Sequence, residues 1–255
     1  MSGKHSHALY VHGHSPLHRL APQCKLAAQI LFVLLVVATP REAFWAFGMY
    51  ALMLVALIQL SEVPYGFVLK RLLFEVPFVL FAVLLPFIAQ GPRTEFLGLS
   101  LAVDGLWGAW NILAKATLGL GASILVAATT TTPEFLRGFE RLHLPRAFTS
   151  IASFMIRYGD VIADEMRRMR VARESRGYDP RWLWQARAIA ASAGALFIRS
   201  YERGERVYLA MVSRGFTGSI PRIDDAPATA ATWATAMALP AAAGLVALLA
   251  WVRVP

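Results

Sequence analysis

Ala172–Tyr178 reads Ala-Arg-Glu-Ser-Arg-Gly-Tyr, and Ala210–Phe216 reads Ala-Met-Val-Ser-Arg-Gly-Phe. Both copies follow the pattern Ala-x-x-Ser-Arg-Gly-aromatic, and each closes an arginine-rich run of helical character. Glycine just after a helix often takes a left-handed conformation, which it adopts without a steric penalty from Cβ. The arginine before it then lies in the last turn, at the negative end of the helix dipole. The repeat predicts two helices that end alike and that each present one guanidinium group to another protein.

Ordinary helix capping explains the arginine and the glycine of each copy. It does not explain the alanine before the serine-arginine pair or the aromatic residue after the glycine. Two copies that agree at all of these positions therefore favour a shared function over two unrelated caps. A guanidinium group on a rigid support is suited to bidentate pairing with a carboxylate in a partner's groove.

The composition is typical of a membrane protein. Of the 255 residues, 57% are hydrophobic and 16% are charged, whereas a soluble domain is about half apolar and about a quarter charged. Mean hydropathy is +0.51. The only cysteine, Cys24, excludes an internal disulfide and is interpreted as a small core residue. The N-terminus lacks the apolar core of a signal peptide.

The expected fold class is all-α, a polytopic membrane protein with about five transmembrane helices and a cytoplasmic coupling domain of long amphipathic helices. Four regions follow along the chain: a histidine-rich leader at 1–25, four transmembrane helices at 26–132, coupling helices at 133–222, and a linker with a final transmembrane helix at 223–255. The expected spans are Leu26–Thr39, Ala43–Leu60, Leu72–Ala89, Leu106 to about Thr130, and Ala230–Trp251.

The connections between these spans leave one alternative open. A span needs about 20 residues, and the first apolar run is short, so 26–60 forms either two spans joined by a turn at Pro40 or one re-entrant hairpin. Ser61–Arg71 is expected to be a polar connection and Gln90–Asp104 a loop.

Two charged residues fall within the apolar runs. Glu75 is interpreted as an interfacial carboxylate, and Lys115 either extends toward the nearer surface or pairs within the bundle. Gly119 and Gly121 permit close approach of a neighbouring helix.

Three further helices are expected between spans four and five, at Pro133–Leu142, Pro145–Arg176 and Pro180–Arg214. The second carries an apolar stripe with spacings of three and four: Phe148, Ile151, Met155, Tyr158, Ile162, Met166 and Met169. At ~1.5 Å per residue, the two longer helices exceed about 40 Å. Such helices suit a surface along a bilayer or a scaffold beneath it.

Charge sets the expected orientation. Residues 133–222 hold sixteen arginines and nine acidic residues, a net charge of +7. A basic block can bind nucleic acid or anionic lipid, or mark the cytoplasmic side of a membrane protein, and the apolar composition favours the last. Placing the block inside also places Lys70 and Arg71 inside with the leader's basic residues. We therefore expect a lipid bilayer as partner, no nucleic acid, and a location in the bacterial cytoplasmic (inner) membrane.

Histidines concentrate in the leader, where the pairs His5/His7 and His12/His14 offer imidazoles to a transition metal. No carboxylate or thiol completes a recognisable metal site there. The other interpretation is a disordered or loosely docked leader whose histidines bind nothing. No metal site is therefore assigned, and these four residues stay weak candidates.

The sequence contains no recognisable catalytic motif. It lacks a Gly-x-x-x-x-Gly-Lys-Ser/Thr loop for ATP, a His-Glu-x-x-His pattern and a Cys-x-x-Cys pattern. We expect no catalytic residue, no cofactor and no enzyme activity of the chain itself. Two alternatives from other classes remain: a membrane enzyme that acts on lipid phosphate through Glu75 and Lys115, and a basic platform for anionic lipid or nucleic acid.

With these motifs in view, the sequence resembles the transmembrane T component of energy-coupling factor (ECF) transporters, the EcfT/CbiQ family, and is closest in character to its CbiQ branch. That family carries two Ala-Arg-Gly-type signatures at the ends of cytoplasmic coupling helices. The matching positions here are Ser175-Arg176-Gly177 and Ser213-Arg214-Gly215, with serine in place of alanine. The stretch from Thr131 to Pro145 and the N-terminal entry from Ser15 to Leu26 also resemble the family.

The resemblance implies partners and a role. Arg176 and Arg214, with the serine and glycine beside each, would form the interface to two ATP-binding cassette ATPase subunits, one arginine for each subunit. The long helices would hold a separate substrate-binding membrane subunit similar to CbiM, and ATP hydrolysis would take place in the ATPases. The substrate implied first is cobalt, with nickel or a vitamin such as biotin as alternatives.

Overall fold

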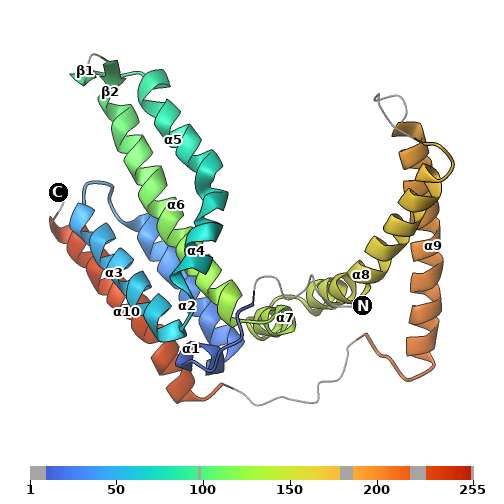
Figure 1. Ribbon diagram of the computed structural model, residues 1–255. Helices are drawn as coiled ribbons and strands as arrows, with labels where there is room; N and C mark the ends of the chain where they lie inside the picture. Colours follow the sequence, from blue (N-terminus) through green and yellow to red (C-terminus); the bar gives the residue numbers. More distant parts are fainter. Residues whose placement is uncertain (1–9, 97–98, 179–185, 219–227, 254–255) are drawn as a thin grey trace. The chain divides into compact units, whose positions relative to one another are not determined.

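The computed structural model describes residues 10–96, 99–178, 186–218 and 228–253. These residues form two compact units, which Figure 1 shows in the colours of the sequence. The bundle unit comprises the described residues up to Leu142 and those from Ala228 onward. The hairpin unit comprises the described residues from His143 to Gly218.

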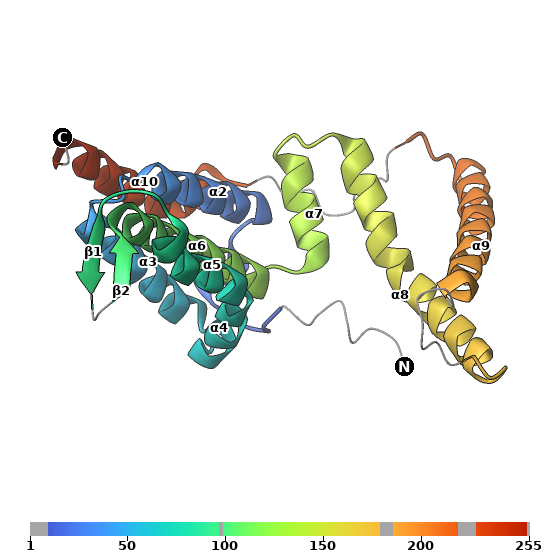
Figure 2. The ribbon, with the colours of Figure 1, turned by 90° about the horizontal axis from the view of Figure 1, so that it is seen from above.

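The bundle unit is almost entirely helical, as expected. Its elements are α1 Pro16–Arg19, α2 Pro22–Ala38, α3 Phe44–Ser61, α4 Tyr65–Leu72, a 3₁₀ turn η1 Leu73–Glu75, α5 Val76–Ile88, β1 Arg93–Phe96, β2 Leu99–Ala102, α6 Val103–Thr129, α7 Thr132–Arg141 and α10 Ala230–Arg253. Seen from above, α2, α3, α6 and α10 lie side by side (Figure 2).

Four helical segments of the described residues are long and apolar enough to cross a membrane: Phe44–Ser61, Tyr65–Ile88, Val103–Thr129 and Ala230–Arg253. The first expected span, Leu26–Thr39, corresponds to α2, an apolar helix of 17 residues, which is about 26 Å long at ~1.5 Å per residue. Since α2 has 17 residues and α3 has 18, each approaches the length of about 20 residues that a span needs, which favours two spans over a re-entrant hairpin.

Close helix contacts depend on small residues. A Cβ on Gly121 of α6 would lie 2.6 Å from Leu54 Cδ2 of α3, and one on Gly105 would lie 2.6 Å from the Pro86 Cα of α5. The role expected for Gly121 is thus confirmed. In the core, the Tyr50 hydroxyl lies 2.9 Å from Thr39 Oγ1 and donates to the Ala243 carbonyl at 3.4 Å, which ties α3 to α10.

The outward faces of the bundle are strongly apolar. Leu52, Leu80 and Leu245 are each more than 60% exposed, at 66%, 62% and 67%. Apolar side chains that face outward over several helices require a lipid environment rather than water. Together with the long apolar helices, they identify a polytopic membrane protein.

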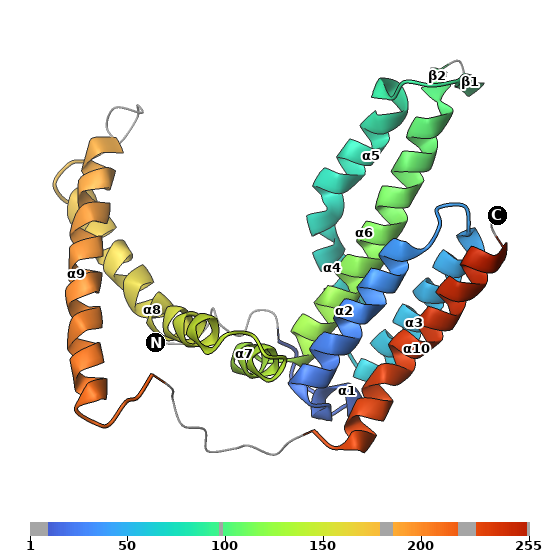
Figure 3. The same ribbon diagram turned by 180° about the vertical axis from the view of Figure 1, so that it is seen from behind.

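Two expectations for the connections were wrong. Residues from Tyr65 onward are helical, so the expected polar connection Ser61–Arg71 already contains most of α4, which continues through η1 into α5. The Arg71 guanidinium lies 3.8 Å from the centre of the Phe67 ring, an arrangement that lets a basic residue pack on the helix surface. The expected loop Gln90–Asp104 contains the antiparallel strands β1 and β2, with Arg93 opposite Ala102. This strand pair lies at the end of the α5–α6 helix pair (Figure 3).

Glu75 and Lys115 have separate partners. Glu75 is buried and accepts a hydrogen bond of 2.6 Å from Thr117 Oγ1 of α6. Lys115 Nζ donates to the Val37 carbonyl of α2 at 2.7 Å. Because both polar groups stabilise helix contacts at different places, they form no common site for a lipid phosphate.

The described part of the leader is docked on the bundle. The Val11 N–H donates to the Ala128 carbonyl at 2.9 Å, and Ser15 caps α1. Lys25 at the start of α2 is buried, and its Nζ donates to the Thr129 carbonyl at 2.8 Å and to Thr130 Oγ1 at 3.3 Å. These bonds satisfy acceptors at the end of α6, where helical partners run out.

Helix α7 packs against α2. Its start is a capping box, in which the Thr131 N–H donates to Glu134 Oε2 at 2.8 Å. A Cβ on Gly138 would lie 2.6 Å from Leu26 Cδ1, and Arg141 Nη1 donates to Gln23 Oε1 at 3.1 Å. The sequence analysis assigned this helix to the coupling region, whereas its contacts join it to the bundle unit.

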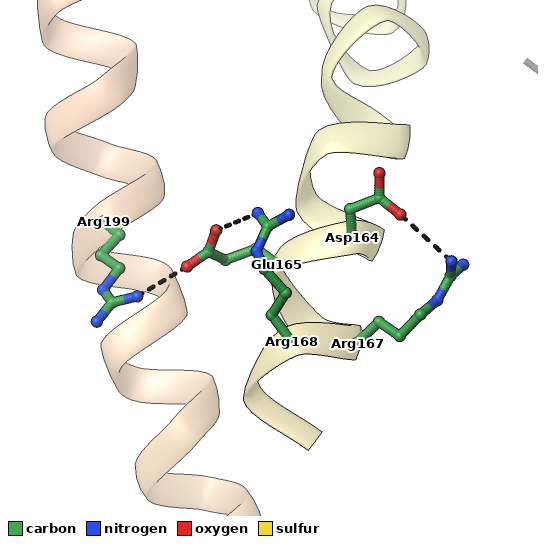
Figure 4. A network of polar contacts seen from close by, with 5 residues as sticks. All are labelled: Asp164, Glu165, Arg167, Arg168 and Arg199. Atoms are coloured by element: carbon green, nitrogen blue, oxygen red, sulfur yellow. Dashed lines mark hydrogen bonds and ion pairs between the residues drawn. The ribbon is translucent and has the colours of Figure 1, made fainter. Parts of the chain in front are cut away.

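The hairpin unit consists of α8 Arg146–Glu174 and α9 Ala186–Val212. The expected start of the third coupling helix at Pro180 lies outside the described residues. The helices are antiparallel, because Phe154 early in α8 faces Met211 at the end of α9, and Arg173 late in α8 faces Ile189 near the start of α9. Glu165 of α8 joins the two helices by accepting from Arg199 Nη1 of α9 at 2.7 Å, and its carboxylate also accepts from Arg168 Nη2 of its own helix at 2.6 Å (Figure 4).

Candidate coupling site at two helix ends

The first copy of the repeated motif forms a Schellman cap. Gly177 has φ of +79°. Its N–H donates to the Glu174 carbonyl at 3.0 Å, and the Tyr178 N–H donates to the Arg173 carbonyl at 3.1 Å. These are the two hydrogen bonds that define this helix end, and they leave Arg176 as the last residue before the left-handed glycine.

The second copy has the same geometry. Gly215 has φ of +81°. Its N–H donates to the Val212 carbonyl at 2.9 Å, and the Phe216 N–H donates to the Met211 carbonyl at 3.0 Å. The prediction that both helices end alike is thus confirmed down to the pattern of backbone hydrogen bonds.

The serine of each copy completes the cap. Ser175 Oγ donates to the Ala172 carbonyl at 3.1 Å, and Ser213 Oγ donates to the Ala210 carbonyl at 3.0 Å. Each bond satisfies a carbonyl group that has no partner within the helix. The serine therefore holds its own helix end, and its hydroxyl is already engaged before any partner arrives.

The aromatic residues of the two copies are half-buried, but their neighbours differ. Tyr178 packs near Arg173, whose guanidinium carbon lies 5.9 Å from the centre of the ring. The position equivalent to Arg173 is Met211 in the second copy, so no cation–π pair of this kind is possible there. In both copies the N–H of the residue after the glycine bonds the carbonyl of the residue five positions earlier, and in the first copy the two side chains also pack together.

Arg176 and Arg214 differ from the other arginines around them. Both are exposed, and among the described residues neither guanidinium makes an ion pair or a hydrogen bond. By contrast, Arg168, Arg170 and Arg199 each lie 2.6–2.7 Å from a glutamate oxygen. The motif arginines thus remain available for a carboxylate on another protein.

The antiparallel arrangement sets the two motif arginines at opposite ends of the hairpin unit. The end of α8 lies beside the beginning of α9, so the distance between Arg176 and Arg214 is close to the length of α9. With 27 residues at ~1.5 Å each, that length is roughly 40 Å. A single small groove on one partner cannot contact both arginines at this distance. Two partners, or two copies of one partner, can contact one arginine each.

The hairpin unit also has an uncovered apolar surface. In α8 the stripe is only partly covered by α9: Tyr158 and Ile162 line the seam between the helices, whereas Phe148 and Ile151 are 64% and 58% exposed. In α9, Phe197 is 72% exposed. Two helices with so little burial between them need a further surface to cover their apolar side chains.

The leader histidines form no metal centre in the part of the chain that the structure describes. No group of three or more metal-ligating side chains occurs there, and His12 and His14 are exposed. His18 is instead structural, since its ring nitrogens lie 2.7 Å from Ser15 Oγ and 3.0 Å from the Val11 carbonyl. His5 and His7 lie outside the described residues.

Comparison with known proteins agrees with this geometry. A family model described as CbiQ, cobalt transport protein, matches residues 13–223, a range that includes both arginine motifs. The chain belongs to the CbiQ family. The CbiQ match thereby confirms the resemblance found in the sequence.

Relatives of this CbiQ-family chain carry the name energy-coupling factor transporter transmembrane protein EcfT. The protein from Listeria innocua is 28% identical over 223 residues, which cover 82% of this chain and 83% of the relative. Those from Streptococcus thermophilus and Bacillus subtilis are 26% and 28% identical and cover 82% of this chain, and 84% and 83% of the relatives. The chain is therefore similar to the transmembrane component of energy-coupling factor transporters over most of its length.

Sequence reasoning located both arginine motifs but missed two features around them. It did not place the two arginines at opposite ends of a hairpin, because the pairing of α8 with α9 depends on contacts between residues far apart in the chain. It also did not assign the serine hydroxyl, for which the spacing from Ala172 to Ser175 is the available signal.

Proposed function

We propose that this protein is the non-catalytic transmembrane scaffold of an ECF-type ABC importer. It couples ATP hydrolysis by two partner ATPase subunits to a separate substrate-binding membrane subunit. The observation that carries the proposal is the pair of matched helix caps, each with an exposed arginine that has no partner among the described residues.

Each motif arginine is suited to one ATPase subunit. A guanidinium group makes two parallel hydrogen bonds to a carboxylate, and such a pair is directional. The Schellman cap fixes where the helix ends, so the arginine projects from a defined position. Ser175, Gly177, Ser213 and Gly215 form the interface with the two arginines by holding these ends in place.

Two anchors at opposite ends of one hairpin explain how motion passes through the scaffold. When the ATPases close on ATP, they shift the two ends relative to each other. A single anchor would allow the hairpin to pivot, whereas two anchors separated by the length of α9 turn the closure into rotation or bending of the helix pair. The ion pair between Glu165 of α8 and Arg199 of α9 resists separation of the helices during this motion.

The exposed apolar side chains of the hairpin unit suit the substrate-binding membrane subunit. Membrane proteins present apolar surfaces, and Phe148, Ile151 and Phe197 offer a matching one. Cobalt is the first substrate that we propose, because the family is described as cobalt transport protein, and the partner would then resemble CbiM. Nickel or a vitamin such as biotin remains the alternative.

The proposed location is the bacterial cytoplasmic membrane, with the hairpin unit in the cytoplasm. The positive-inside rule supports it, since residues 133–222 carry a net charge of +7. The cytoplasm is also where ATP is available to the partner subunits.

The test is a double substitution, Arg176→Ala with Arg214→Ala, in cells that make the complete transporter. We expect the ATPases to be lost on purification of this chain and uptake to stop. Arg206→Ala is the matched control, because Arg206 lies on α9 two turns before Arg214, has a side chain that is 70% exposed and is paired with Glu202. Retention of active ATPases at wild-type levels by the double variant would refute the proposal.

A further inference from the structure

A cavity lies in the bundle unit where α2, α3, α6 and α10 meet the docked leader. Its volume is about 680 Å³, within the range of small-ligand sites, ~300–1,000 Å³. The inner wall is apolar and includes Phe32, Leu54 and Leu125. The cavity is also lined by Leu57 and Leu60 of α3 and by Thr235 and Leu239 of α10. Because Leu60 is 56% exposed, the cavity reaches the outward side of the bundle between these two helices.

One end of this cavity is basic. His14, Arg19 and Lys25 line it, and its lining contains no acidic residue. Lys25 is buried and already donates to the Thr129 carbonyl and to Thr130 Oγ1. Arg19 and His14 are exposed, and within the described part of the chain their side chains make no hydrogen bond or ion pair. Two side chains that carry or can take a positive charge are therefore free at the mouth of an apolar cavity.

We propose that this cavity binds an anionic phospholipid, with one acyl chain among the helices and the phosphate group at Arg19 and His14. The two halves of the cavity match the two halves of such a lipid. Basic pockets between transmembrane helices on the cytoplasmic side bind anionic headgroups, and this mouth lies at the bundle end that carries Arg19 and Lys25. A water-soluble phosphate compound would fill the basic mouth but leave the apolar wall uncovered.

The position of the site gives the lipid a structural role. Its lining comes from the leader and from all four neighbouring helices, so the bound lipid connects segments that are far apart in sequence. Thr129, at the end of α6, is one lining residue. A lipid bound here therefore stabilises the leader against the α6 end that Lys25 also holds.

The test measures lipid binding to the purified full-length chain in detergent by native mass spectrometry. The probes are phosphatidylglycerol and phosphatidylethanolamine with identical acyl chains. One basic residue near an anionic surface contributes about 1 kcal/mol, so we expect one phosphatidylglycerol per chain and at least about fivefold weaker binding after Arg19→Gln. Arg93→Gln on β1 removes the same charge from a different part of the bundle unit and should leave binding unchanged.

A second variant tests the apolar half of the site. Thr235→Trp places a large ring in the cavity from an exposed position of α10, and it should weaken the binding of both lipids. The same elution volume as the unchanged chain on gel filtration shows that the variant is folded. Four results would each overturn the proposal. Two concern lipid choice and charge: equal binding of both lipids to the unchanged chain, and equal losses of binding for Arg19→Gln and Arg93→Gln. The other two are unchanged binding by folded Thr235→Trp, and displacement of the lipid by glycerol phosphate at equal concentration.

Discussion

The glycine of each motif offers a test that leaves both arginines in place. Gly177 and Gly215 have φ of +79° and +81°, and a left-handed conformation costs a residue with a Cβ about 1–2 kcal/mol. Nothing lies within 4 Å of a Cβ built at either glycine, so Gly→Ala adds backbone strain without a clash. The altered end relaxes by fraying while it is free and must form the cap again when the ATPase binds.

The expected result follows from this cost. Gly177→Ala and Gly215→Ala should each weaken binding of the ATPase subunits by about 1–2 kcal/mol, or roughly five- to thirtyfold. The assay is titration of purified ATPases onto the chain in nanodiscs, followed by interferometry. Because asparagine tolerates the left-handed region better than alanine, Gly177→Asn should bind more tightly than Gly177→Ala.

Gly159 provides the matched control. It lies inside α8 on an exposed face, and an added Cβ there also has nothing within 4 Å. Gly159→Ala should stabilise the helix by about 0.5–1 kcal/mol and leave ATPase affinity unchanged. Wild-type affinity for both Gly177→Ala and Gly215→Ala would refute the reasoning that the caps position the arginines.

Two further predictions concern the stability of each unit. Hydrogen bonds from Arg168 and Arg199 lower the pKa of Glu165 from its ordinary value of 4.5. The Glu165 carboxylate therefore contributes its full stabilisation above pH 4.5, and this stabilisation is lost as pH falls through the lower pKa of the folded state. Glu165→Gln should remove this dependence, so proteolysis of the segment between α8 and α9 should be faster in the variant at pH 7. The difference from the unchanged chain should shrink as pH falls through the lower pKa, and equal rates at pH 7 would contradict the role of the pairs. In the bundle unit, Gly121→Ala pushes a Cβ to 2.6 Å from Leu54 Cδ2, and overpacking of this kind costs about 1–3 kcal/mol. Gly121→Ala should therefore lower the unfolding temperature in detergent. Gly48→Ala is the control and should not lower it, because a Cβ at Gly48 has nothing within 4 Å. Equal unfolding temperatures for the two variants would argue against the close contact of α3 and α6.

Local sequence patterns predicted much of the fold. Apolar runs of sufficient length predicted the spans, and the glycines after Arg176 and Arg214 predicted left-handed caps because few other residues take that conformation. The polar appearance of Lys70 and Arg71 concealed the start of α4, since an arginine that packs over Phe67 looks the same in sequence as one in a loop. The short β1–β2 pair has no strong local signal between two long helices.

Features that depend on distant residues were not predictable in this way. Lys25 bonds Thr129 across 104 positions, and the lining of the bundle cavity comes from residues between His14 and Leu239. No periodicity within one helix indicates which helices surround a cavity or that a leader closes it. The candidate coupling site was predictable because each half lies within seven consecutive residues, whereas the distance between the halves required the pairing of α8 with α9.

The most direct test of the two-anchor account is cross-linking from each motif in the assembled transporter. The only native cysteine, Cys24, is buried, so Ser175→Cys and Ser213→Cys each introduce one accessible thiol beside a motif arginine. With a short cysteine-to-lysine reagent, each variant should form a cross-link to an ATPase subunit, and the two variants should label different subunits of the pair. Cross-links from both positions to one subunit, or only to this chain itself, would contradict the account.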